Sequence, residues 1–149
     1  MARYLVVAHE TVTNPKLLKQ VRSVMNDDPE AEFVLLVPAT PVRHLRFWRG
    51  GREHDAEATA KRLAEKARAM FAKHGVNLAD ARVGKESPVE AIDDEVTADP
   101  GYAGFIISTL PQETSRWLRM DLPRTVWSKY DKPVYHVQAT PEWSAGDLP

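Results

Sequence analysis

The sequence predicts an α/β fold in which a mainly parallel sheet carries helices on both faces. Short continuous apolar runs, typical of strands buried on both faces, alternate along the chain with segments whose apolar residues recur at helical spacing. Two of the helical segments begin with a capping residue followed by proline. Strict alternation of strand and helix requires crossover connections, and these favour parallel strands with helices on both faces.

The composition restricts the class of protein. With 149 residues the chain is expected to form one domain with a core of its own. The formal net charge of −1 gives no basic field, so nucleic acid is not expected as a partner. The absence of cysteine excludes disulfides and cysteine nucleophiles. The first residues are typical of a strand rather than a signal peptide, and no apolar run reaches the roughly 20 residues of a membrane span, so a cytoplasmic protein is expected.

Five strands are expected along the chain. Continuous apolar runs predict buried strands at residues 4–8, 33–37 and 105–107. A weaker, alternating run at residues 76–83 predicts a third strand near an edge of the sheet. Residues 133–138 predict a fifth strand, which would also lie at an edge.

Four helices are expected between these strands. Asn14 and Ser87 are capping residues followed by proline, and Asp121 marks the start of another helix. An alanine-rich segment at residues 54–74, closed by Gly75, has one apolar stripe that suits packing against a sheet. The last helix is expected to bury one face made by Leu122, Val126, Trp127 and Tyr130.

In this order the elements resemble the universal stress protein family over about residues 3–138. The resemblance rests on YLVVAHET, on the alanine-rich helix that ends at Gly75, on Val83-Gly84 with Pro88, and on the final strand, loop, helix and strand from FIIST to PVYHV. It implies a three-layer α/β sandwich, adenine nucleotide alpha hydrolase-like, with a five-stranded parallel sheet in the order 3-2-1-4-5. It also implies one universal stress protein-like domain at residues 1–140, followed by a C-terminal tail at 141–149.

The family resemblance indicates where a ligand would bind. ATP-binding members hold the nucleotide at the carboxyl ends of strands 1 and 4, with the loop pattern G-x-x-G-x(9)-G-[S/T]. This chain carries Ser108, Pro111, Asp121 and Leu122 at the defining positions, and His9 where the family usually has aspartate. Pro111 lacks an amide donor, and Asp121 places a carboxylate where a phosphate would lie. Standard ATP binding and a cofactor are therefore not expected, and ATP or AMP held by altered contacts is the alternative.

The predicted ligand site is a cleft between strands 1 and 4, either empty or filled by a non-standard small ligand. The residues expected to line it are His9, Glu10, Thr11, Val37, Gly84, Ser108, Thr109, Ser115 and Arg116. If a nucleotide binds, Gly84 is expected near the ribose and the last four of these residues near the phosphates.

The loop before the last helix has a second interpretation. Arg116 is expected to pair with Asp121 or Glu113, because nearby opposite charges usually find each other. Trp117 and Leu118 would then pack over the sheet, and the loop would contact no ligand.

Catalysis and metal binding are not predicted. His9 and Glu10 are residue types that serve as acid and base, but the chain has no G-x-S-x-G nucleophile elbow. A hydrolase or transferase that uses His9 with Ser108 or Ser115 is therefore the least favoured alternative. The five histidines show no ligand spacing.

The remaining predictions concern partners. The basic, aromatic segment at residues 42–53 is expected to be a solvated loop, with a ligand lid and a nucleic-acid patch as alternatives. The family resemblance implies a homodimer through residues 133–138, with Trp143 of the tail reaching the partner. The expected function is a non-enzymatic regulatory or stress-response module with a degenerate nucleotide-binding site.

Overall fold

The structure, a computed structural model, describes residues 2–40, 53–111 and 115–139, without the side chains of residues 53–55, 116 and 119. The expectations for the segment at 42–53 lie outside the described residues, apart from the start of a helix at Glu53. The expectations for the tail at 141–149 and for Trp143 lie outside them as well.

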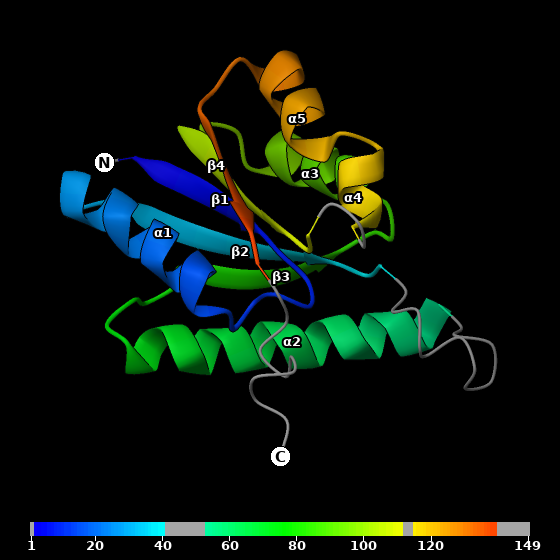
Figure 1. Cartoon of the computed structure of the whole chain (residues 1–149), viewed down its shortest axis with the longest axis horizontal. Coiled ribbons are helices and arrows are strands. Elements are labelled where there is room, and N and C mark those ends of the chain that lie inside the picture. Colours follow the sequence, from blue (N-terminus) through cyan, green and yellow to red (C-terminus); the bar gives the residue numbers. More distant parts are fainter. Residues whose placement is uncertain (1, 41–52, 112–114, 140–149) are drawn as a thin grey trace.

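The described chain forms one parallel sheet with helices on both faces (Figure 1). Its elements are β1 (Arg3–Val7), α1 (Pro15–Asp27), β2 (Glu32–Pro38), α2 (Glu53–Lys73), β3 (Asp80–Gly84), α3 (Pro88–Ala98), β4 (Gly104–Thr109), α4 (Arg116–Arg119), α5 (Leu122–Tyr130) and β5 (Val134–Gln138). The five strands lie in the order β3-β2-β1-β4-β5, and each neighbouring pair is parallel. The predicted fold class and strand order are confirmed.

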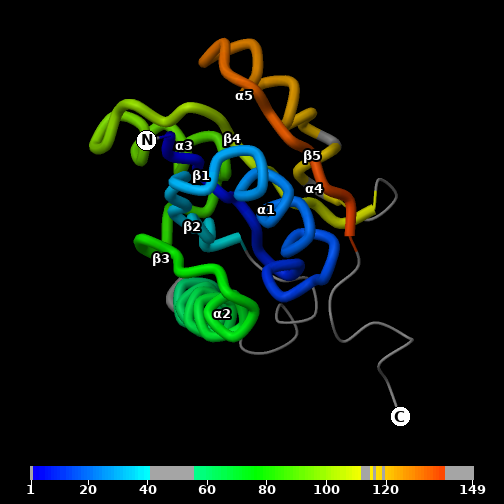
Figure 2. Tube along the Cα trace, turned by 90° about the vertical axis from the view of Figure 1, so that its left-hand side faces the viewer, coloured from blue at the N-terminus to red at the C-terminus, as the bar shows by residue number. Residues whose placement is uncertain are grey.

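Two cores lie on opposite faces of the sheet, because successive strand residues point to opposite sides. On β1, Val6 packs in the core shared with α1 and α2, whereas Leu5 and Val7 pack against α3, α4 and α5. On β4, Ile106 and Ile107 divide in the same way. Figure 2 shows the sheet between these two groups of helices.

The predicted helix boundaries are confirmed where the sequence has capping chemistry. The Asn14 side chain accepts a hydrogen bond from the Lys16 amide at 2.8 Å, and the Ser87 side chain accepts one from the Glu90 amide at 3.4 Å. Gly75 follows α2 with φ +85°, a conformation that glycine adopts without steric cost.

Two expectations were wrong. The third strand begins at Asp80 rather than at residue 76, because Val76 and Leu78 are buried in the core beside α2 before the chain joins the sheet. Trp127 is 57% exposed and does not share the buried face of α5. Five residues of helix rotate it by about 140° from Leu122, away from the face that Leu122 and Val126 bury.

Candidate functional site

The switch point of the sheet lies where β1 and β4 run side by side. The helix after β1 packs on one face of the sheet, and the helices after β4 pack on the other. In open α/β sheets a ligand crevice forms outside the carboxyl ends of two such strands. The candidate site is therefore built from residues 8–14 after β1 and 108–111 at the end of β4.

Buried hydroxyl groups at this switch point bond to one another and to nearby protein groups. Thr11 Oγ1 and Ser108 Oγ lie 2.5 Å apart, and both residues are buried. Thr109 Oγ1 lies 2.8 Å from Nε2 of His136 on β5. We call Thr11, Ser108 and Thr109 the hydroxyl cluster. Because each hydroxyl has a protein partner, the cost of burying it is already offset without a ligand.

His9 is the exception to this pairing. Its side chain is 7% exposed, and Nε2 has no hydrogen-bond partner in the described part of the chain. Burial lowers the pKa of His9 to about 4, so the imidazole is neutral at pH 7. Glu10, the next residue, does have an interaction of its own. A buried polar atom without a partner is uncommon in folded proteins and calls for an explanation.

Past β4, the described residues Pro111 and Ser115 already bond to other protein groups. The Ser115 amide donates to the Pro111 carbonyl at 2.9 Å, and the Ser115 side chain caps the short helix α4 by accepting from the Leu118 amide at 3.0 Å. Asp121 precedes α5 in the left-handed conformation, with φ 50° and no side-chain cap bond. Leu122 is fully buried in the core beside Trp117. The burial of Trp117 agrees with the second interpretation of this loop, in which Trp117 packs over the sheet.

Val37 and Gly84, two further predicted site residues, have structural roles of their own. Val37 is fully buried in the core against α1 and α2. Gly84 ends β3, two strands away from β1. A Cβ atom at Gly84 would lie 2.7 Å from Cβ of Ala91, so close packing against α3 requires glycine here. The side chain of Arg116 lies outside the described residues, so its pairing with Asp121 or Glu113 stays a prediction.

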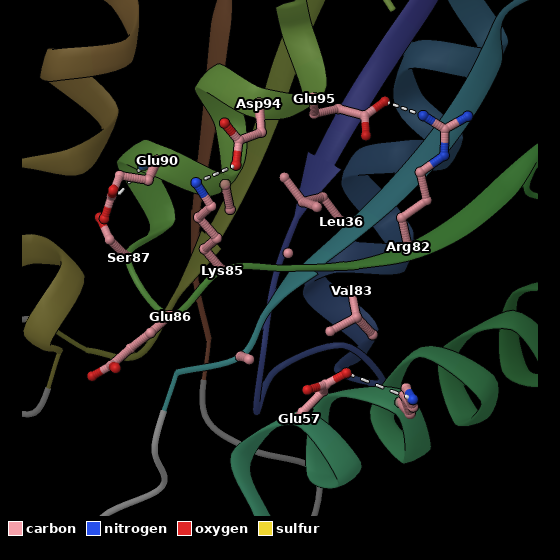
Figure 3. Close-up of a pocket in the computed structure, with 14 residues that line it drawn as sticks. Leu36, Glu57, Arg82, Val83, Lys85, Glu86, Ser87, Glu90, Asp94 and Glu95 are labelled. Carbon is pink, nitrogen blue, oxygen red and sulfur yellow. Dashed lines mark hydrogen bonds and ion pairs between the residues drawn. The ribbon is translucent and has the colours of Figure 1, made fainter. Parts of the chain in front are cut away.

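A groove of about 1080 Å³ lies elsewhere, along β3 between α2 and α3 (Figure 3). Of the residues predicted from the sequence to bind a ligand, it contains only Gly84. Its remaining lining is mostly charged: Glu57, Lys61, Arg82, Lys85, Glu86, Glu90, Asp94 and Glu95. The sequence analysis did not identify these residues as a site.

An ionic network centred on the buried carboxylate of Glu95 lies on the α3 side of this groove, to whose lining Arg82 and Glu95 belong. The Arg82 guanidinium donates to the Glu95 carboxylate and, at 2.8 Å, to Asp80, while the Tyr102 hydroxyl donates to Glu95 at 2.7 Å. Hydrogen bonding to Glu95 raises the pKa of Arg82, and hydrogen bonding to Arg82 lowers the pKa of Asp80. Burial, followed by the bond to Glu95, raises the pKa of Tyr102. The sequence does contain one signal for this network: helical spacing places Glu95 on the apolar face of α3 with Ala91 and Ile92.

The described residues contain neither a metal-binding cluster nor a membrane-spanning helix. In that part of the chain no three histidine or acidic side chains come together in a way that could hold a metal ion. None of its helices combines the length and apolar character needed to cross a bilayer.

The chain matches no protein-family model, and no curated protein is similar to it in sequence. Several solved structures do share its fold, each over 93% of this chain. One is a universal stress protein in complex with cAMP, with a TM-score of 0.63, 11% identity and 98% of its own chain covered. Two are from Archaeoglobus fulgidus: a universal stress protein with a TM-score of 0.59, 14% identity and 94% coverage, and one in complex with dAMP with a TM-score of 0.56, 15% identity and 98% coverage. At these identities the likeness is one of fold.

Proposed function

We propose that the protein is a non-enzymatic regulatory or stress-response module of the universal stress protein type, which does not bind ATP in that family's standard way. The observation that carries this proposal is the buried hydrogen bond between Thr11 and Ser108 at the switch point. The structures of similar fold support the universal stress protein part of the proposal.

The chemistry of the switch point argues against a triphosphate. A phosphate group needs free donors and a positive surrounding. The Ser108 hydroxyl is already paired, Pro111 has no amide hydrogen, and Asp121 adds a negative charge at the start of α5. Leu122 lies in the core and offers no hydroxyl. Binding a triphosphate here would therefore require breaking existing bonds and placing like charges together.

The described residues of the site include a hydroxyl–imidazole pair that a substrate cannot reach. Thr109 and His136 have the spacing of a nucleophile and its base. Thr109 is only 2% exposed, however, so a substrate could not approach its hydroxyl without rearrangement of the strand end. This supports a binding or regulatory role over hydrolysis.

A second candidate function is the binding of an adenosine monophosphate. The unpaired Nε2 of His9 favours it, because a bound ligand would supply the missing hydrogen bond. Two of the structures with the same fold are complexes with cAMP and dAMP, which carry one phosphate each. One phosphate demands fewer donors than a triphosphate does.

Calorimetry and thermal unfolding with ATP, AMP, cAMP and dAMP, each with and without Mg²⁺, test both proposals. A ligand present at 100 times its Kd stabilises the folded state by about 2.7 kcal/mol, which raises the Tm by roughly 5 to 10 °C for a domain of this size. We expect no shift with ATP. Saturable ATP binding at micromolar concentration would refute the first proposal. Binding of AMP or cAMP that is lost in His9→Ala would establish the second.

The homodimer through β5 and the cytoplasmic location stay predictions. In the described sheet β5 is an edge strand that pairs with β4 alone, and its Tyr135 is exposed. An exposed edge of this kind supports pairing with a second copy.

A further inference from the structure

The opposite edge of the sheet is formed by β3. This strand pairs with β2 and with no other strand in the described part of the chain. All five of its residues are only partly buried. An edge strand of this kind presents backbone N–H and C=O groups that can pair with an added chain.

Helices α2 and α3 stand on either side of this edge and make it a groove (Figure 3). Its volume of about 1080 Å³ exceeds the roughly 300 to 1,000 Å³ of typical small-molecule pockets. Three residues of β3 line it, Arg82, Val83 and Gly84, and the lining continues through residues 85–87 into α3. The shape therefore suits an extended chain better than a compact ligand.

The charges along the groove leave an excess of carboxylates. Its lining has five acidic and three basic side chains. Each basic side chain already has an acidic neighbour: Arg82 with Glu95, Lys85 with Asp94 at 3.2 Å, and Lys61 with Glu57 at 3.7 Å.

The two remaining carboxylates belong to Glu86 and Glu90. Neither has an ion-pair partner among the residues that the structure describes. Both lie at the end of β3 where the chain enters α3. An occupant with positive charge would therefore gain most at this end of the groove.

We propose that the β3 edge binds an extended basic segment of another protein, which joins the sheet as a further strand beside β3. Main-chain hydrogen bonds to β3 would provide affinity, and lysine or arginine at alternate positions would pair with Glu86 and Glu90. A second copy of this chain is a poorer occupant, because it would bring two acidic grooves together.

Fluorescence anisotropy with the full-length protein tests this proposal. The probe is a labelled octapeptide of alternating lysine and threonine, and the comparison peptides replace lysine by glutamate or carry N-methyl groups on the backbone. We expect saturable binding of the basic probe, at least tenfold weaker binding of the N-methylated probe, and none of the acidic one. The double variant Glu86→Gln/Glu90→Gln is expected to weaken binding at least fivefold.

The matched control is Glu30→Gln/Glu65→Gln, which removes two exposed carboxylates outside the groove and should leave the affinity unchanged. Equal binding of the N-methylated probe would overturn the proposal, because the attraction would then be one of charge alone. Equal binding by the Glu86/Glu90 variant would overturn it as well. Sedimentation that shows self-association of the protein, lost in the Glu86/Glu90 variant, would assign the edge to a second copy instead.

Discussion

The protein buries polar side chains in two places, and the two differ in chemistry. The hydroxyl cluster at the carboxyl ends of β1 and β4 consists of neutral groups that bond over short distances. The ionic network beneath α3 joins β3, α3 and the segment before β4 through Arg82, Glu95 and Tyr102. Neutral hydroxyls cost little to bury once paired, whereas a buried carboxylate depends strongly on its partners.

The two regions also differ in how much of their polar surface is left open to a ligand. The hydroxyl cluster pairs its polar groups at the point where open α/β sheets form ligand crevices, whereas Nε2 of the nearby His9 has no partner among the described residues. The ionic network holds α3 against the sheet and leaves an open groove beside it. The polar groups of the switch point are therefore largely paired, whereas the β3 edge keeps an open, charged groove.

The largest effect is expected from Glu95→Ala. This change leaves Arg82 and the buried Tyr102 hydroxyl without their shared acceptor, so the free energy of unfolding should fall by roughly 3 kcal/mol. Urea denaturation measures it. The matched control is Asp94→Asn on the same helix, which breaks the exposed pair with Lys85 and should cost less than about 0.5 kcal/mol. Equal losses in the two variants would show that burial of the Glu95 carboxylate contributes nothing.

A pH dependence of intermediate size is expected from His9. The folded state keeps His9 neutral down to about pH 4, while the unfolded chain protonates it near 6.5. The unfolded state therefore binds more protons in this range, and the free energy of unfolding should fall by roughly 2.5 kcal/mol between pH 7 and pH 4.5. Urea denaturation at both pH values should show a much smaller fall for His9→Gln. His136→Gln, the control, should keep most of it, and an unchanged fall in His9→Gln would contradict the assignment.

The smallest effect is expected from the hydroxyl cluster. Thr11→Val and Ser108→Ala each leave one buried hydroxyl without a partner and should cost about 1.5 kcal/mol. The double variant removes both hydroxyls, so its cost should be lower than the sum of the single costs by about 1 kcal/mol. Urea denaturation of all four proteins gives this coupling. Additive costs would indicate that the two hydroxyls do not depend on each other.

The sequence predicted the parts of the fold that depend on local chemistry. Asn14 and Ser87 cap helices because their side chains accept from amides two or three residues ahead, which sequence spacing alone reveals. Apolar runs located β1, β2 and β4 because those strands are buried on both faces.

The features that the sequence missed depend on distant neighbours. The start of β3 was misplaced because Val76 and Leu78 alternate like strand residues but are buried beside α2. Helical spacing places Glu95 on the apolar face of α3, but its pairing with Arg82 and the groove along β3 appear only once the helix is packed on the sheet. At the switch point the residue types were predicted, but the bond between Thr11 and Ser108 joins positions 97 residues apart.

Gly84 restricts how this chain can evolve. Any Cβ atom there would meet Ala91, and Glu95 follows Ala91 by one turn of the same helix, so a substitution would displace the carboxylate from Arg82 together with α3. The glycine therefore has a structural reason that holds with no ligand bound. Among related sequences, a glycine retained at this position would reflect the packing of α3 and would not by itself reveal a nucleotide-binding protein.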